Sequence, residues 1–185
     1  MSLFTASLNS GSNGNCYYVG NSNEAVLIDA GISCRETENR MARLGLNIHS
    51  VKAIFISHEH NDHIKGVKVL SKKYKIPVYI TESTMHSGRL IFNEGLVNDF
   101  KPHEAITIGN LQVIPFPKLH DAADPYSFVV KHQEVCVGVM TDIGSNCKHV
   151  INYFKQCHAV YLEANYDSTM LETGHYPIYL KRRIS

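Results

Sequence analysis

The sequence has no excess of either charge and no long apolar run. It contains 18 Lys and Arg residues against 17 Asp and Glu residues, a formal net charge of +1. This balance excludes a global basic field that would attract nucleic acid or anionic lipid, so a polyanion would have to meet a local patch. No apolar run approaches the roughly 20 residues of a membrane-spanning helix, and the first residues do not resemble a signal peptide. We therefore expect no membrane contact.

A disulfide pattern is also missing. The five cysteines are an odd number without a C-x-x-C pair: Cys16, Cys34, Cys136, Cys147 and Cys157. This distribution is typical of reduced thiols in a cytoplasmic protein and excludes a disulfide framework. Repeats, low-complexity segments and linkers are absent as well. With 44% hydrophobic and 19% charged residues, the composition predicts a single globular domain, 1–185.

Short apolar runs alternate with segments of helical period. Residues 25–29 (AVLID) and 53–57 (AIFIS) are typical of buried strands. Ser33 and Glu36 form a capping box for a helix that Gly45 can end. Further strands are expected at 2–8, 16–20, 77–81, 111–120 (broken by Pro115 and Pro117), 126–142 (a hairpin) and 159–165, and helices at 63–74, 83–95 and 149–157. The alternation predicts an α/β fold with more than one sheet.

Four chemically relevant polar residues follow apolar strands at their C-terminal ends: Asp29, His58, His120 and Asp142. Strand ends are rigid supports for a functional site, whereas the loops above them can vary. The repetition of this placement indicates that these residues serve one site.

The segment SHEHNDH (57–63) places His58, His60, Asp62 and His63 within six positions. Alternate residues of an extended segment point the same way, so the first three can share one side. His63, at the start of a helix, would point toward the same site from the opposite side. Imidazoles suit Zn, Fe or Mn, and the carboxylate adds a hard oxygen. The cluster indicates two adjacent metals.

The other seven histidines have an alternative interpretation, as surface or core residues without a metal. We retain it for His49, His86, His103, His132, His149, His158 and His175.

The loop NSGSNGN (9–15) is a candidate anion site. Gly11 and Gly14 free the backbone so that N–H groups can point at a phosphate. The side chains that would add hydrogen bonds are Ser10, Ser12, Asn13 and Asn15. A plain hairpin turn explains the same residues equally well.

These motifs resemble those of the metallo-β-lactamase-fold hydrolases. SHEHNDH looks like their signature, and Asp29 in LIDAG, His120 in KLHDAADP and Asp142 in TDIG follow their first four motifs in order. Longer stretches are similar to the YycJ (WalJ)-like branch: SLNSGSNGNCYYVG, SHEHNDHIKG, LHDAADPYSF and LEANYDSTMLETGHYPIYLKRRIS. The resemblance covers nearly the whole chain and implies an αββα four-layer sandwich of two facing mixed sheets.

The resemblance also implies roles for the ligands. His58, His60 and His120 would hold one divalent metal, Asp62 and His63 the second, and Asp142 would bridge them. Asp29 would hold the loop that carries the histidines in place without binding a metal itself. The implied cofactors are two divalent ions, Zn²⁺, Mn²⁺ or Fe, whose bridging hydroxide is the nucleophile. Asp62 would also be catalytic, taking or steering the proton of the attacking water.

The sequence departs from the family pattern in two places. The fifth motif, a histidine in a GHLS-like segment after KRRIS, does not occur among the 185 residues. We therefore expect the last elements of the fold to be missing and the second metal to bind more weakly, and we do not assign His175 in its place. Tyr166 stands where relatives often carry histidine.

Three functions remain open. The resemblance implies a 5′-to-3′ DNA exonuclease, with DNA as the substrate partner. The alternatives are a hydrolase of a lactone, thioester or cyclic phosphate, and a non-catalytic binding or regulatory domain. A basic rim beside the site would favour DNA, and its candidates are Lys65, Lys68, Lys72, Lys181, Arg182 and Arg183. The native metal and the oligomeric state do not follow from the sequence.

Overall fold

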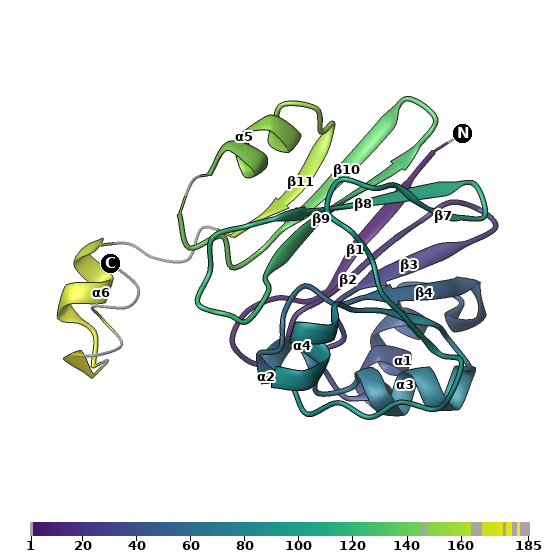
Figure 1. The fold of residues 1–185 in the computed structure, drawn as a ribbon, viewed down its shortest axis with the longest axis horizontal. Coiled ribbons are helices and arrows are strands. Elements are labelled where there is room, and N and C mark those ends of the chain that lie inside the picture. Colours follow the sequence, from purple (N-terminus) through teal and green to yellow (C-terminus); the bar gives the residue numbers. More distant parts are fainter. Residues whose placement is uncertain (1, 146, 164–167, 176, 179–180, 182–185) are drawn as a thin grey trace.

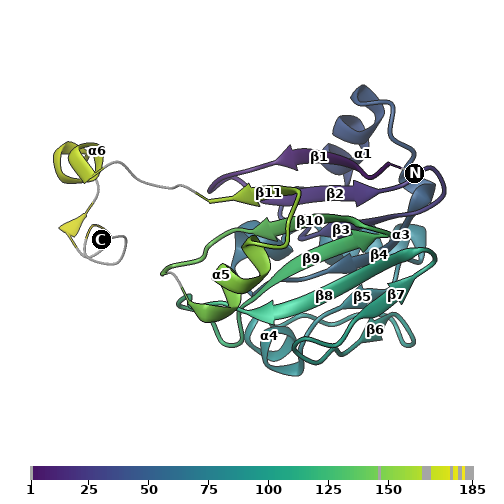
Figure 2. The same cartoon turned by 90° about the horizontal axis from the view of Figure 1, so that it is seen from above.

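Two facing sheets with helices on their outer sides make up the fold. The structure is a computed structural model that describes residues 2–145, 147–163, 168–175, 177–178 and 181. Figure 1 and Figure 2 show the two sheets stacked, with α1 and α3 outside the first and α5 outside the second. This arrangement confirms the αββα sandwich that the sequence resemblance implies.

The first sheet has the strand order β1-β2-β3-β4-β5-β6. The first three strands are antiparallel, and β3 to β6 are parallel. The bounds are β1 (Phe4–Asn9), β2 (Cys16–Gly20), β3 (Ala25–Ile28), β4 (Val51–Phe55), β5 (Val78–Tyr79) and β6 (Val97–Asn98). In β3, Val26 and Ile28 face the second sheet, whereas Ala25 and Leu27 face the helices. Because both faces are buried, this strand is apolar at every position.

The second sheet has the order β11-β10-β9-β8-β7. Its pairs are antiparallel except β10 with β11, which run parallel. The bounds are β7 (Ile106–Ile108), β8 (Leu111–Pro117), β9 (Tyr126–His132), β10 (Val135–Met140) and β11 (Ala159–Leu162). β9 and β10 form the predicted hairpin, whose turn contains Gln133 at φ 52°.

The prediction that Pro115 and Pro117 break their strand is wrong. β8 pairs with β9 through Pro117, which lies opposite Tyr126. The carbonyl of Pro115 accepts from His103 N–H, on the side away from β9. In an antiparallel strand the nitrogen and carbonyl of one residue point the same way, so both prolines direct their nitrogens away from β9. On that side β7 pairs with β8 only as far as Val113. Neither proline therefore removes a bond of the β8–β9 ladder.

The helices are α1 (Cys34–Arg43), α2 (Asn61–Ile64), α3 (Val67–Tyr74), α4 (Glu82–Ser87), α5 (Lys148–Phe154), α6 (Ser168–Thr173) and the 3₁₀ turn η1 (Ile48–Ser50). The helix α1 begins as predicted, because Ser33 Oγ accepts from Glu36 N–H. Three apolar layers hold the sandwich together: one between α1, α3 and the first sheet, one between the sheets, and one under α5.

Three helices are shorter than predicted, and one of them, the expected helix 149–157, ends at Phe154. The expected helix 63–74 is interrupted at Gly66, whose N–H donates to Ala30 O. A Cβ at Gly66 would lie 1.9 Å from Ile32 O, so the loop after β3 approaches the backbone closely at this break. The expected helix 83–95 ends at Ser87, and Arg89 there adopts φ 49°.

No helix among the described residues is long and apolar enough to cross a membrane. All five cysteines are free, and Cys16, Cys34 and Cys136 are buried. The absence of disulfides agrees with the expectation from their number and spacing.

Candidate metal centre

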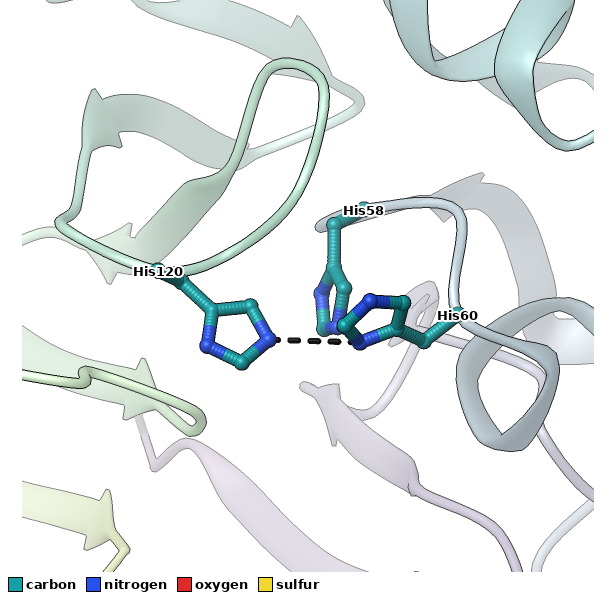
Figure 3. Close-up of side chains that lie close together, drawn as sticks. All are labelled: His58, His60 and His120. Atoms are coloured by element: carbon teal, nitrogen blue, oxygen red, sulfur yellow. Dashed lines mark hydrogen bonds between the residues drawn. The ribbon is translucent and has the colours of Figure 1, made fainter. Parts of the chain in front are cut away.

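The first group of potential ligands is His58, His60 and His120. His58 and His60 lie in the loop after β4, and His120 lies in the loop after β8. His58 Nε2 is 3.0 Å and His120 Nε2 is 3.3 Å from His60 Nδ1. Figure 3 shows the three rings converging from these two loops. Their ligand atoms all lie within 4.8 Å of one another, an arrangement that suits one cation.

Burial keeps two of these imidazoles neutral. Burial first, and the charge of Lys118 second, lower the pKa of His58 far below its usual range. The same two causes lower the pKa of His120 to about 4. Because a histidine binds metal in its neutral form, both rings are ready to act as ligands at neutral pH.

The second group is His58, His63 and Asp142, whose ligand atoms also lie within 4.8 Å of one another. His63 Nε2 is 2.9 Å from Asp142 Oδ2. That oxygen is buried, and apart from this contact it has no hydrogen-bond partner among the described residues. Burial opposes the charged form of His63, but Asp29 and Asp142 raise the pKa of its ring to about 9. An acceptor oxygen and an imidazole nitrogen held this close fit a second cation in place of the proton.

A chain of hydrogen bonds sets the protonation of the two buried rings. Asp29 accepts from the N–H and O–H groups of Ser57, both at 2.8 Å, and from His63 Nδ1 at 2.7 Å. Because the Ser57 hydroxyl proton goes to Asp29, Ser57 Oγ is an acceptor for His58 Nδ1 at 2.9 Å. Both rings therefore carry hydrogen on Nδ1, and Nε2 of each is available to a cation.

Two carboxylates of the centre stand on left-handed backbone. Asp29 has φ 61° after β3, and Asp142 has φ 47° after β10. Most side chains avoid this region, and such residues concentrate at functional sites. The strand ends thus bring together Asp29, His58, His120 and Asp142, as the sequence predicts.

Asp62 lies beside the second group but does not belong to either set of three. Its Oδ2 is 3.5 Å from His63 Nε2 and accepts from Asn15 Nδ2 at 3.2 Å. The Asp62 carbonyl also accepts from Asn15 N–H at 2.6 Å. A Cβ at Gly31 would lie 1.6 Å from that carbonyl, so this close approach requires glycine. Asn15 and Gly31 together hold Asp62 next to His63.

The loop 9–15 separates into an inward and an outward part. Asn15 is buried, and its Oδ1 accepts from Gly11 N–H. Ser10 Oγ accepts from Tyr17 O–H, and Ser10, Ser12 and Asn13 are exposed. Of the four predicted substrate contacts, Asn15 is thus turned toward the metal centre, and the other three lie on the surface of the loop.

Sequence reasoning missed three residues that support the centre. Ser57 relays the hydrogen bonds described above. Glu59 Oε1 accepts from Ala123 N–H at 2.8 Å and so connects the histidine loop to the loop after His120. Lys118 is buried, and its Nζ donates to Thr141 O at 2.7 Å. Their proximity to His58 and His120 in the sequence was the available signal, but such neighbours are usually without a role.

The predicted basic rim is only partly described. Lys65, Lys68 and Lys72 are exposed along α2 and α3. Lys68 and Lys72 line a cavity of about 650 Å³ with Ile91 and Phe92, and the ligand histidines are not among its lining residues. Lys181 Nζ donates to Glu172 O. Arg182, Arg183 and Tyr166 lie outside the described residues.

Comparisons with known proteins agree with this geometry. A family profile described as "Metallo-beta-lactamase superfamily" matches residues 10–137. The chain is 36% identical to exodeoxyribonuclease YycJ of Bacillus anthracis over 189 aligned positions, 100% of this chain and 71% of that protein. It is 31% identical to exodeoxyribonuclease WalJ of Streptococcus pneumoniae, over 96% of this chain and 68% of that protein.

A solved structure shows the same fold. The metallo-beta-lactamase fold protein YhfI from Bacillus subtilis matches with a TM-score of 0.67 and 15% identity, over 82% of this chain and 66% of that one. The profile and the two exodeoxyribonucleases show that the chain belongs to the metallo-beta-lactamase superfamily of metal-dependent hydrolases, in the group of YycJ and WalJ.

Proposed function

We propose that the protein is a DNA exonuclease that uses two divalent ions and degrades a strand from its 5′ end. The observation that carries the proposal is the pair of ligand groups that share His58, His58-His60-His120 and His58-His63-Asp142. The names of the two relatives, exodeoxyribonuclease YycJ and WalJ, support DNA as the substrate.

The donor set fits Zn²⁺ or Mn²⁺ in both groups. His58, His60 and His120 would hold one ion, and His63 and Asp62 the second, with Asp142 between them. Nitrogen and carboxylate ligands together suit both metals. When bound, the two ions supply Lewis-acid polarisation of a phosphoryl group and acidify a water molecule.

The protein groups then position reactants and move the proton. Asp62 is the candidate acceptor for the proton of the attacking water, since its carboxylate is half-exposed beside His63. Asn15 keeps this carboxylate in place through its amide. Asp29 and Ser57 hold the ligand rings, so the chemistry requires little rearrangement of the centre.

The substrate strand would be bound by the loop 9–15. Ser10, Ser12 and Asn13 are exposed there and offer side-chain hydrogen bonds to a phosphate. Gly11 and Gly14 adopt φ 107° and 141°, conformations that let neighbouring N–H groups point toward an anion. The exposed Lys65 and Lys68 would add attraction to the phosphate backbone.

The test is nucleotide release from a 5′-phosphorylated DNA duplex with Mn²⁺ or Zn²⁺. A strand labelled at its 3′ end should shorten stepwise while keeping its label, which distinguishes attack from the 5′ end. We expect Asp62→Asn to lower the rate about 10²- to 10⁴-fold. Asp99→Asn, an exposed carboxylate outside both ligand groups, is the control and should leave the rate unchanged.

The same assay, run on other substrates, distinguishes DNA from another substrate class. Hydrolysis of a lactone, thioester or cyclic phosphate without release of nucleotides would contradict the DNA assignment. Full activity of Asp62→Asn on DNA would contradict the role of Asp62.

A further inference from the structure

Lys118 is a buried cation that joins two strand ends of the metal centre. It follows β8, two residues before His120, and its side chain is buried. Its Nζ donates to the carbonyl of Thr141, the residue before Asp142, at 2.7 Å. In the sheet, β9 lies between β8 and β10. Lys118 therefore reaches past the start of β9 to the end of β10.

Backbone contacts hold the main chain of Lys118 and its neighbour in place. Lys118 N–H donates to Pro125 O at 3.1 Å. Leu119 forms isolated bridges with Gly144 and Ser145, just past Asp142. The segments 118–120 and 141–145 thus lie side by side, and Lys118 is the side-chain link between them.

A buried ammonium is unfavourable unless the fold uses its charge or its hydrogen bonds. The carboxylates whose charges act on Lys118 are those of Asp142, Asp29 and Glu163. A leucine or methionine would fill the same space without that desolvation. A buried lysine at this position therefore points to a role in the centre rather than in packing.

Asp142 is the residue that needs such support. Its φ of 47° is a left-handed conformation that persists only where surrounding contacts impose it. Apart from the 2.9 Å contact with His63 Nε2, its Oδ2 has no hydrogen-bond partner among the described residues. The bond from Lys118 holds the peptide group immediately before it.

We propose that Lys118 is a positioning residue that holds the Thr141–Asp142 peptide, and with it the Asp142 carboxylate, in register with His120. It would thereby fix the position of one ligand group relative to the other. This inference rests on the two-ion centre proposed above and assigns Lys118 no contact with the substrate.

The test is a titration of the metal-free protein with Mn²⁺ or Co²⁺, followed by calorimetry and, for Co²⁺, by the visible spectrum. In Lys118→Met, we expect one ion to bind nearly as in the wild type and the second to bind about 10- to 100-fold more weakly, the usual effect of removing a group that orients a ligand. In the Co²⁺ spectrum, the absorption due to the second ion should change.

Lys52→Met is a matched control, since Lys52 Nζ also donates to a backbone carbonyl, that of His49 at 2.9 Å, but is exposed on β4. It should bind both ions as the wild type does. Thermal unfolding of each metal-free variant reports folding separately. Lys118→Gln, which keeps side-chain N–H groups, is the second variant.

Unchanged affinity for both ions in a folded Lys118→Met would overturn the inference, as would a folded Lys118→Gln that binds the second ion no more tightly than Lys118→Met. If neither variant folds, Lys118 belongs to the fold and the inference is also wrong. A wild-type protein that binds fewer than two ions would instead contradict the proposed function, so the two failures are distinguishable.

Discussion

At the residue scale, Ser57 and Asp29 determine which ring nitrogens of His58 and His63 face the ligand groups. Its hydroxyl donates to Asp29 and accepts from His58 Nδ1. Asp29 in turn accepts from His63 Nδ1. Ser57 therefore directs Nε2 of His58 toward the ligand groups, and Asp29 directs Nε2 of His63. Groups that orient ligands contribute to metal affinity without touching the metal.

We predict that Ser57→Ala weakens metal binding about 10- to 100-fold, because His58 loses the acceptor that fixes its tautomer. The loss of stability should be about 1–3 kcal/mol, the usual cost of leaving buried hydrogen-bond partners unsatisfied. Calorimetric titration with Zn²⁺ and urea unfolding measure the two effects. Ser71→Ala is the control, since Ser71 is equally buried and its Oγ donates to Ile76 O. It should lose similar stability and no metal affinity.

The sequence predicted the potential ligands because they are rare residue types at close spacing. His58, His60 and His63 stand out for that reason. Ser57 does not, since serine beside a strand end is common and its function depends on Asp29, 28 positions away. The position of Asn15 was also unpredictable, because an amide in a glycine-rich loop can face solvent or the interior.

At the element scale, the break between α2 and α3 places His63. At this break Gly66 N–H donates to Ala30 O, in the loop after β3, and not to a carbonyl of the preceding helical turn. The Ala30 N–H in turn donates to His63 O. The helical period of 63–74 predicted one helix because it reports only which side chains are apolar, not where another segment approaches the backbone.

We predict that Gly66→Ala destabilises the protein by about 1–3 kcal/mol, because the added methyl group would overlap Ile32 O and force the backbone to shift. Metal affinity should fall as well, since α2 carries His63. Urea unfolding and metal titration test both statements. In Gly88→Ala the nearest atoms to the new Cβ lie at 3.1 Å, so this variant should be milder. Equal stability of the two variants would contradict the account.

The other element that the sequence predicted incorrectly is β8. Proline is a reliable sign of a strand's end only where its nitrogen faces a partner strand. Pro115 and Pro117 face away from β9, and this direction follows from the register of the sheet. The register depends on residues far away in the sequence, so local pattern alone predicted a break that is absent.

At the scale of the whole molecule, the two sheets are linked at the end opposite to the metal centre. Buried Glu24 lies before β3, whereas Asp29 follows it. Its Oε1 accepts from Asn21 Nδ2 at 2.9 Å and from Asn110 N–H, in the β7–β8 turn, at 2.8 Å. One carboxylate thus connects a turn of each sheet.

We predict that Glu24→Ala lowers the free energy of unfolding by about 1–3 kcal/mol, the range for hydrogen bonds to a charged group. The hydrogen bond from Asn21 is the main cause that lowers the pKa of Glu24 from 4.5. The contribution should therefore be present above pH 4.5 and disappear as the pH falls through the lowered value. Urea unfolding against pH measures this, with Glu134→Ala in the exposed β9–β10 turn as control. A difference between wild type and Glu24→Ala that persists at low pH would contradict it.

The central claim is that the strand ends of both sheets hold two adjacent divalent ions. The most direct measurement is anomalous diffraction from crystals grown with Mn²⁺ or Zn²⁺. The account predicts two peaks roughly 3.5–4 Å apart, the usual separation in two-metal sites. One should lie among His58, His60 and His120, and the other beside His63 and Asp142. A single peak, or peaks away from these residues at saturating metal, would contradict the account.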